Sequence, residues 1–258
     1  MSSALHRMVS SSQVSDWFNQ DGDLSVPSRI GKTLDITNTG LQLYLDANNP
    51  SSYSGTGTTW NDISGNSKNF TWTSSPSYNS SGIKYFNTNG YGANGPASNS
   101  FGINNTSGYT FIFTMYQNAL NTTASFKWYG TAGYGRSIFS HATWVDGNIY
   151  WDQGGCCGAD TRTNVGLPNS TGNWHVIGLR CNYSGTNRTI WDNGTILTTN
   201  TSGIANIDLS ATAANIGYSD EYGTNWNARI GQFAVYNRSL SDTEMTSVTN
   251  TFKSKVGL

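Results

Sequence analysis

The segment Tyr109–Tyr116 constrains the fold most, because it reads as a β-strand with apolar side chains on both faces. One face carries the large apolar residues Tyr109, Phe111, Phe113 and Met115. The other face includes Ile112 and Tyr116, since successive side chains of a strand point to opposite sides of the sheet. Such a strand needs cover on both faces, so the pattern predicts a layered β protein with this strand in the centre of one sheet.

Two dipeptides predict hairpins in the second half of the chain. Asn193-Gly194 separates the strand-like segments 188–192 and 195–198, and Asp146-Gly147 separates 137–144 from 148–152. Both dipeptides accept the positive φ angles that tight hairpin turns require. These signals favour an antiparallel arrangement of short strands.

A single helix is predicted at the C-terminal end. Ser241 is a suitable N-cap, and Glu244 lies three residues later, as a capping box requires. The apolar residues that follow are spaced to form one stripe, made by Met245, Val248, Phe252 and Val256. We expect this stripe to pack on the sandwich.

Composition excludes several classes of protein. Only 11% of the 258 residues are charged and the net charge is −1, so no basic surface for nucleic acid is expected. The 13% aromatic residues argue against disorder despite the many Gly, Ser, Thr and Asn residues. No apolar run approaches the roughly 20 residues of a membrane-spanning helix, so no membrane insertion is expected. The opening residues MSSALHRMVSSS also lack the apolar stretch of a secretory signal.

Three segments together resemble a known family of β-sandwich domains. They are GLQLYLDANNPSSYSGTGTTWNDISGN from Gly40, WHVIGLRCNYSGTNRTIWDNGTIL from Trp174, and ARIGQFAVYNRSLSDTE from Ala228. These segments resemble the opening, middle and end of the laminin-G-like, concanavalin A-like lectin/glucanase jelly-roll domain, of the kind found in phage and other virion structural proteins. The resemblance implies an all-β, two-sheet antiparallel jelly roll over residues 40–258, with the helix at its end.

Residues 1–39 are predicted to be a short N-terminal arm, either flexible or anchoring. Trp17 and Phe18 are adjacent in this arm, and a large exposed apolar pair often marks a contact surface. We therefore take Trp17 and Phe18 as candidate subunit contacts of an anchoring arm.

The sequence predicts no enzymatic activity. Sandwich glycoside hydrolases need two carboxylates across the scissile bond, but this chain has only the glutamates Glu221 and Glu244. Glu244 is assigned to the helix cap, and Asp220 and Glu221 are neighbours that would point to opposite faces of a strand. His141 and His175 are interpreted as structural, and no catalytic sequence motif is present.

Aromatic residues beside Asn and Asp residues suggest a site for sugar. The candidates are Trp144, Tyr150, Trp151, Tyr222 and Trp226. The alternative is that these rings are core or loop anchors. Calcium, which prefers oxygen ligands, is the one cofactor considered, and its candidate ligands are Asp46, Asp62 and Asp152. The Asp62 carboxylate could instead accept backbone N–H groups of its own turn.

The three cysteines do not suggest a disulfide framework. Cys156 and Cys157 are adjacent, Cys181 stands alone, and no spacing suggests zinc. We expect free, buried or half-buried thiols.

The resemblance leads to the hypothesis of a non-enzymatic virion structural protein, a capsid decoration or fibre component assembled in the host cytoplasm and displayed on the virion surface. Its expected partners are the major capsid or fibre protein, further copies of itself in a homo-oligomer, and a host cell-surface glycan. The alternative is a carbohydrate-binding module or lectin of a secreted or cell-surface bacterial protein.

Overall fold

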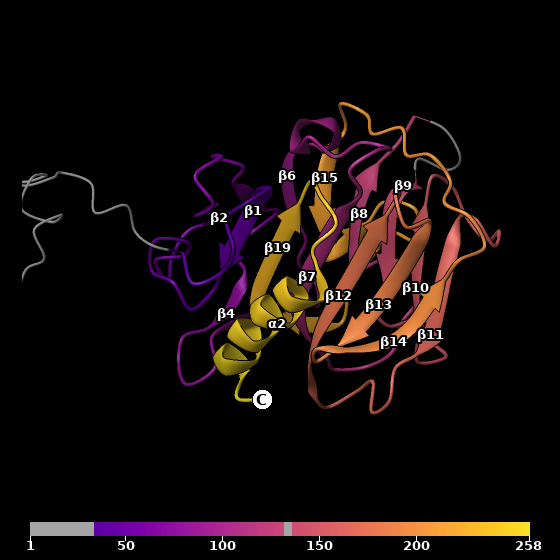
Figure 1. Ribbon diagram of the computed structural model, residues 1–258. Coiled ribbons are helices and arrows are strands. Elements are labelled where there is room, and N and C mark those ends of the chain that lie inside the picture. The colour runs from indigo at the N-terminus through magenta and orange to yellow at the C-terminus, as the bar shows by residue number, and fades with distance from the viewer. Residues whose placement is uncertain (1–33, 132–135) are drawn as a thin grey trace, which may run out of the picture. The chain divides into compact units, whose positions relative to one another are not determined.

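Two antiparallel sheets lie face to face with the hydrophobic core between them (Figure 1). This computed structural model describes residues 34–131 and 136–258, and Ile36–Leu258 is one compact unit. The predicted fold class, a two-sheet antiparallel sandwich followed by one C-terminal helix, is confirmed. Trp17 and Phe18 lie outside the described residues.

The nine-stranded sheet has the order β14-β13-β12-β7-β18-β5-β4, and β19 joins it between β7 and β1. Strand β7 pairs with β12 along one edge and with both β18 and β19 along the other, so it is central as predicted. The strands are β1 (Leu41–Asp46), β4 (Ser77–Asn79), β5 (Tyr85–Asn87), β7 (Tyr109–Gln117), β12 (Trp174–Asn182), β13 (Asn187–Asp192), β14 (Thr195–Asn200), β18 (Ala228–Ile230) and β19 (Gln232–Tyr236).

The eight-stranded sheet has the order β11-β10-β9-β8-β15-β6-β3-β2. Its strands are β2 (Thr59–Trp60), β3 (Phe70–Trp72), β6 (Ala93–Ala97), β8 (Phe126–Tyr129), β9 (Arg136–His141), β10 (Asn148–Gln153), β11 (Arg162–Gly166) and β15 (Ala213–Ile216). Outside the two sheets, the described residues also form the short 3-10 helix η2 (Ser98–Phe101), the strand pair β16 (Tyr218–Ser219) and β17 (Thr224–Asn225), and the C-terminal helix.

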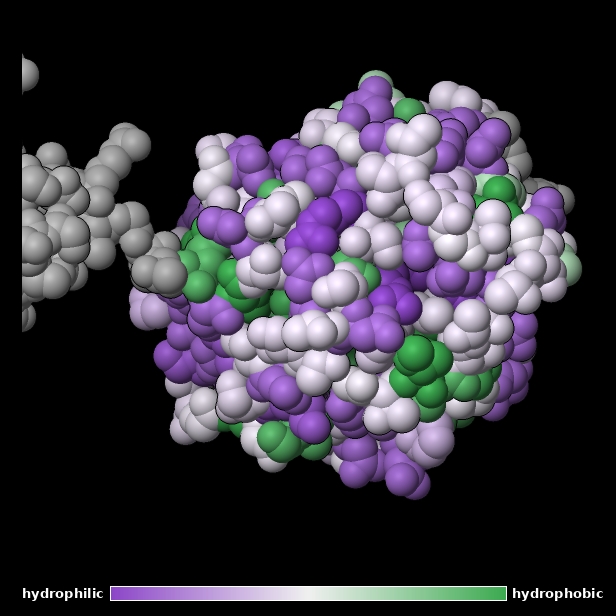
Figure 2. Space-filling view, viewed as in Figure 1, coloured by the Kyte–Doolittle hydropathy of each residue, from purple (hydrophilic) through white to green (hydrophobic). Residues whose placement is uncertain are grey.

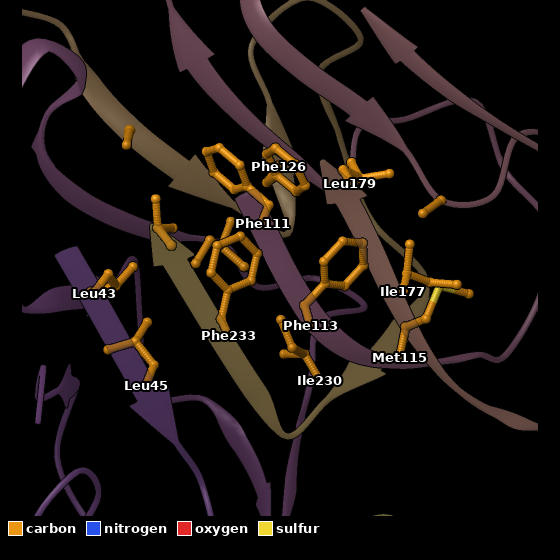
Figure 3. Close-up of a cluster of buried hydrophobic side chains, with 14 of the residues drawn as sticks. Leu43, Leu45, Phe111, Phe113, Met115, Phe126, Ile177, Leu179, Ile230 and Phe233 are labelled. Atoms are coloured by element: carbon orange, nitrogen blue, oxygen red, sulfur yellow. The ribbon is translucent and has the colours of Figure 1, made fainter. Parts of the chain in front are cut away.

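Aromatic rings fill the space between the sheets (Figure 3). Phe111 and Phe113 of β7 meet Phe126 of β8, with ring centroids 4.9 and 5.6 Å apart. Phe233 of β19 stacks on Trp128 of β8 at 5.8 Å. Each of these side chains is at most 1% exposed, and truncating a buried Phe to Ala typically costs about 3–5 kcal/mol. These buried contacts therefore hold the central strands, and the side chains on their outer faces, in fixed positions.

One hairpin prediction is confirmed and the other needs correction. Asn193 and Gly194 have φ angles of 51° and 91° and join β13 to β14 directly. Strand β9, however, ends at His141 rather than at residue 144. The Thr143 N–H donates to the Gln117 side chain, 3.3 Å away, instead of continuing the ladder to β10. The Trp144 N–H still donates to the Asn148 carbonyl, and the Gly147 N–H donates to the Trp144 carbonyl, both at 2.9 Å, so the predicted turn at Asp146-Gly147 joins the two strands.

Helix α2 (Asp242–Val256) covers the outer face of the nine-stranded sheet across β7 and β12 (Figure 1). The predicted capping box is present between Ser241 and Glu244. Phe252 stacks on Tyr44 of the edge strand β1 at 5.9 Å. The helix also packs on β7 and β12, which explains why the central strand β7 is apolar on both faces. On this side of the molecule, hydrophobic residues reach the surface only in small separate groups (Figure 2). None of the helices in the described residues is long and apolar enough to span a membrane.

Candidate functional site

A pocket lies on the outer face of the eight-stranded sheet, over β9, β10 and β11. Strand alternation builds this face: Trp151 of β10 points into the core, so its neighbours Tyr150 and Asp152 point outward. The pocket has a volume of about 240 Å³. Its lining consists of Arg136, His141, Trp144, Tyr150, Cys156, Cys157, Arg162 and Tyr222.

Asp152 organises the floor beneath the pocket. It is fully buried and accepts from Arg136 Nη1 at 2.7 Å and from Arg162 Nε and Nη2 at 2.5 and 2.7 Å. Burial opposes the charge of Arg136, but its pKa is raised because it also pairs with Glu221, through Nη2 and through Nε at 3.0 Å. One buried carboxylate thus holds two guanidinium groups side by side at the pocket wall.

His141 is the most deeply buried polar group of the pocket lining, at 3% exposed. Its Nδ1 lies 2.7 Å from the Thr123 carbonyl, and a carbonyl only accepts, so Nδ1 carries the hydrogen and Nε2 is an acceptor. Burial lowers the His141 pKa to about 4, so the ring is neutral at physiological pH. Nε2 has no hydrogen-bond partner among the described residues and is not sealed from the pocket.

Three half-exposed aromatic rings frame the pocket. Trp144 lies 4.5 Å from the His141 ring and 5.4 Å from Tyr222, measured between ring centroids. Tyr150 is fixed by donating to Asp146 Oδ2 at 2.7 Å and by the Arg162 guanidinium 4.9 Å from its ring. Tyr222 accepts a 2.7 Å hydrogen bond from Arg136 Nη2, and burial raises its pKa, so the phenol stays protonated.

The loop after β10 supplies the remaining wall and corrects one prediction. Cys156 and Cys157 form a disulfide between adjacent residues, although free thiols were expected. The loop closes on itself: the Gln153 N–H donates to the Thr161 carbonyl at 2.7 Å, and Cys156 Sγ lies 3.5 Å from Arg162 Nη2. Cys181 is a free thiol as expected, and burial raises its pKa to about 12.

The structure divides the five sugar-binding candidates. Trp144, Tyr150 and Tyr222 come together at the pocket. Trp151 and Trp226 were wrong as candidates, because they are 0% and 1% exposed and belong to the core. Trp226 also uses its Nε1–H within the protein, donating to Gln117 Oε1 at 2.7 Å.

The calcium candidates do not form a shared site. Asp46 binds Lys255 at 2.6 Å and Gln232 at 3.0 Å, and Asp152 binds the two arginines. Asp62 accepts hydrogen bonds from the backbone N–H groups of Tyr44 and Lys68, both at 2.9 Å. This structural role is the alternative to calcium binding that the sequence suggested. Within the described part of the chain, no group of three His, Cys, Asp or Glu residues could hold a metal.

Several pocket residues were not identified from the sequence. Arg136 and Arg162 lacked any motif, and His141 was interpreted as purely structural. Asp220 and Glu221 also differ from expectation: they lie in the turn between β16 and β17, so both reach the same sheet face, where Asp220 pairs with Lys127 at 3.3 Å and Glu221 with Arg136. The available signal was the alternation of side chains along β9, β10 and β11, which places one set of residues on a single outer face. This set is Phe139, His141, Tyr150, Asp152 and Arg162.

Comparison with known proteins places the fold. No family model matches the sequence, and no curated protein sequence matches it significantly. The chain shares its two-sheet antiparallel jelly-roll fold with solved structures of low sequence identity. The binding domain of Paraclostridial Mosquitocidal Protein 1 is similar, with a TM-score of 0.64 and 17% identity over 83% of this chain and 53% of that one.

Two further solved structures share the fold. The binding domain of botulinum neurotoxin serotype G has a TM-score of 0.63 and 14% identity, over 83% of this chain and 51% of that one. Trypanosoma rangeli sialidase has a TM-score of 0.57 and 16% identity, over 83% of this chain and 33% of that one. The chain therefore matches about half of each toxin binding domain and a third of the sialidase.

Proposed function

We propose that this chain is a lectin-type domain that binds one sugar ring of a glycan in the pocket over β9, β10 and β11. The observation that carries the proposal is His141 Nε2, an unpartnered acceptor on a deeply buried side chain, facing a pocket framed by three aromatic rings. A buried polar atom is normally hydrogen-bonded, and a sugar hydroxyl in the pocket can donate the missing hydrogen bond to His141 Nε2.

The pocket combines the two kinds of contact that a sugar needs. The negative faces of aromatic rings attract the weakly positive C–H groups of a pyranose, and Trp144, Tyr150 and Tyr222 supply such rings. The polar groups fix the orientation of the hydroxyls. At about 240 Å³ the pocket is smaller than the roughly 300 Å³ of drug-sized sites, which suits a single ring rather than an oligosaccharide.

The proposal is binding without catalysis. A hydrolase of the usual type needs one carboxylic acid and one carboxylate beside the substrate. The carboxylates near the pocket in the described residues are Asp146, which accepts from Tyr150, and Asp152, Asp220 and Glu221, which are in ion pairs with Arg or Lys. None of them lines the pocket. The raised pKa of Tyr222 and the lowered pKa of His141 leave both groups neutral near pH 7.

A glycan array followed by calorimetry on the glycans retained tests the proposal. Trp144→Ala should weaken binding at least tenfold, about 1.4 kcal/mol. The matched control is Trp174→Ala, because Trp174 is a half-exposed ring on the other sheet, against Tyr85 and Tyr116. No glycan binding, or equal losses in the two variants, would overturn the proposal.

The structural neighbours support this reading more than the virion reading, because two are named as binding domains and one as a sialidase. A virion-surface location, with a capsid or fibre protein as partner and assembly as a homo-oligomer, stays a prediction from the sequence. Multivalent display would strengthen weak sugar binding in either setting. Mass spectrometry of gradient-purified particles from the source tests it: a stoichiometric signal supports the virion location, and absence from particles contradicts it.

A further inference from the structure

Resting on the proposed function, we infer that the sugar bound in the pocket carries an anionic group, a carboxylate or a sulfate. The pocket lining contains two guanidinium groups, those of Arg136 and Arg162, and no carboxylate. The third basic side chain, His141, is neutral. The carboxylates that pair with these guanidinium groups, Asp152 and Glu221, lie outside the lining, so the charged groups that a ligand meets directly are the arginines.

Arg162 is the main anchor for the anion. Its Nε and Nη2 are fixed on Asp152, and Nη2 also approaches Cys156 Sγ at 3.5 Å. Nη1 makes no hydrogen bond to any described residue, so two charged N–H groups remain for a ligand. Hydrogen bonds from a guanidinium to an anion are roughly twice as strong as neutral ones, and the fixed orientation lowers the entropic cost of forming them.

The unpaired polar atoms of the lining are mostly donors. Within the described residues, Trp144 Nε1 has no acceptor, and the Tyr222 hydroxyl accepts from Arg136 but donates to nothing. His141 Nε2 is the one unpaired ring acceptor on the pocket side. A ligand rich in acceptors matches this set better than one whose hydroxyls must supply donors and acceptors equally.

Glu221 tunes the site from outside the lining. Its carboxylate binds Arg136 in a bidentate manner, through Nε and Nη2, as an anionic ligand would. It comes from the turn between β16 and β17, and its side chain is 25% exposed. Glu221 therefore occupies the Arg136 guanidinium and leaves Arg162 as the anchor for a ligand, so removing the charge of Glu221 should make the pocket a stronger anion site.

Matched sugar pairs separate this inference from the proposed function. The probes are the methyl glycosides of glucuronic and galacturonic acid, those of glucose and galactose, and the 6-sulfates of the latter two, titrated by calorimetry at fixed salt. We expect an anionic member of a pair to bind at least tenfold more tightly than its neutral partner. Its affinity should fall as salt rises, whereas that of a neutral sugar should not. The acid and sulfate arms identify which anion is preferred.

Two charge variants give opposite expected signs. Arg162→Gln should bring the affinities of the anionic and neutral partners to within about twofold of each other, whatever its effect on both, and Glu221→Gln should increase the preference for the anionic sugar at least threefold. Arg180→Gln is the control, since Arg180 pairs with Asp242 on the other sheet. Should Arg162→Gln fail to fold, the salt dependence of binding to the unmodified protein tests the inference: an affinity for the anionic sugar that does not fall as salt rises would contradict it.

Equal affinity for neutral and anionic partners, still dependent on Trp144, would overturn this inference and keep the lectin proposal. Absence of binding for every probe and on the array would overturn both.

Discussion

Protonation of His141 should destabilise the folded protein between pH 6.5 and pH 4. Burial lowers its pKa from 6.5 to about 4, so the unfolded chain takes up a proton in this range before the folded chain does. The stability that depends on a neutral His141 is complete above pH 6.5 and is lost as the pH falls to the folded pKa. At 1.36 kcal/mol per pKa unit, the loss is roughly 3 kcal/mol.

Other groups near His141 must be separated from it. Asp152, Arg136 and Arg162 all act on the charge of the His141 ring. We therefore compare the unmodified protein with His141→Asn, whose amide can still donate to the Thr123 carbonyl but does not titrate. The free energy of unfolding is measured by denaturant titration at several pH values from 7.5 to 4.5.

The difference between the two proteins should shrink or reverse as the pH falls, by roughly 2–3 kcal/mol in total. His175 provides the opposite case: burial lowers its pKa, but the hydrogen bond to Asp192 at 2.9 Å outweighs this and the pKa is raised. Its contribution is present below pH 6.5 and is lost as the pH rises through the folded pKa. Parallel curves for the unmodified protein and His141→Asn would refute the reasoning.

Two further predictions concern the loop beside the pocket. Arg188→Met should leave the melting temperature unchanged or raise it, because Arg188 is fully buried and its Nε and Nη1 are unpaired among the described residues. The carbonyls of Ala159 and Arg162, to which Arg188 donates, would still accept hydrogen bonds from Asn200. A large drop in the melting temperature measured by calorimetry would contradict this. Alkylation of the native, unreduced protein should leave all three cysteines unmodified, and unfolding without reductant should expose Cys181 alone; labelled Cys156 or Cys157 in the mass spectrum would contradict the disulfide.

The frame of the fold could be predicted from local patterns. Tyr109–Tyr116 showed the central strand, Asn193-Gly194 the hairpin, and Ser241 with Glu244 the helix start, because each signal depends on residues adjacent in sequence. The β9–β10 hairpin was predicted as well, but the end of β9 was placed three residues too late, where the Thr143 N–H bonds to the distant Gln117 side chain.

The pocket could be predicted only in part, for the same reason. Because successive side chains of a strand point to opposite faces, Tyr150 and Trp151 cannot both contact the same sugar. Arg136, Arg162 and Glu221 are isolated in sequence and meet only when β9, β11 and the turn after β16 are folded together. The disulfide of the adjacent cysteines likewise depends on how the loop after β10 closes.

Asp152 decides whether this part of the protein is an ion-pair centre or a calcium site. Asp152→Asn keeps the shape but leaves two guanidinium groups, 6% and 21% exposed, without their shared anion. Breaking a buried pair typically costs about 3–5 kcal/mol, which corresponds to a fall in melting temperature on the order of 10 °C. Asp242→Asn is the matched control, because its ion pair with Arg180 is largely exposed on the Asp side and should matter by less than about 1 kcal/mol. Since the arginines already occupy the carboxylate, EDTA should not change the melting temperature of the unmodified protein. A loss of stability in EDTA that is absent in Asp152→Asn would instead make Asp152 a metal ligand.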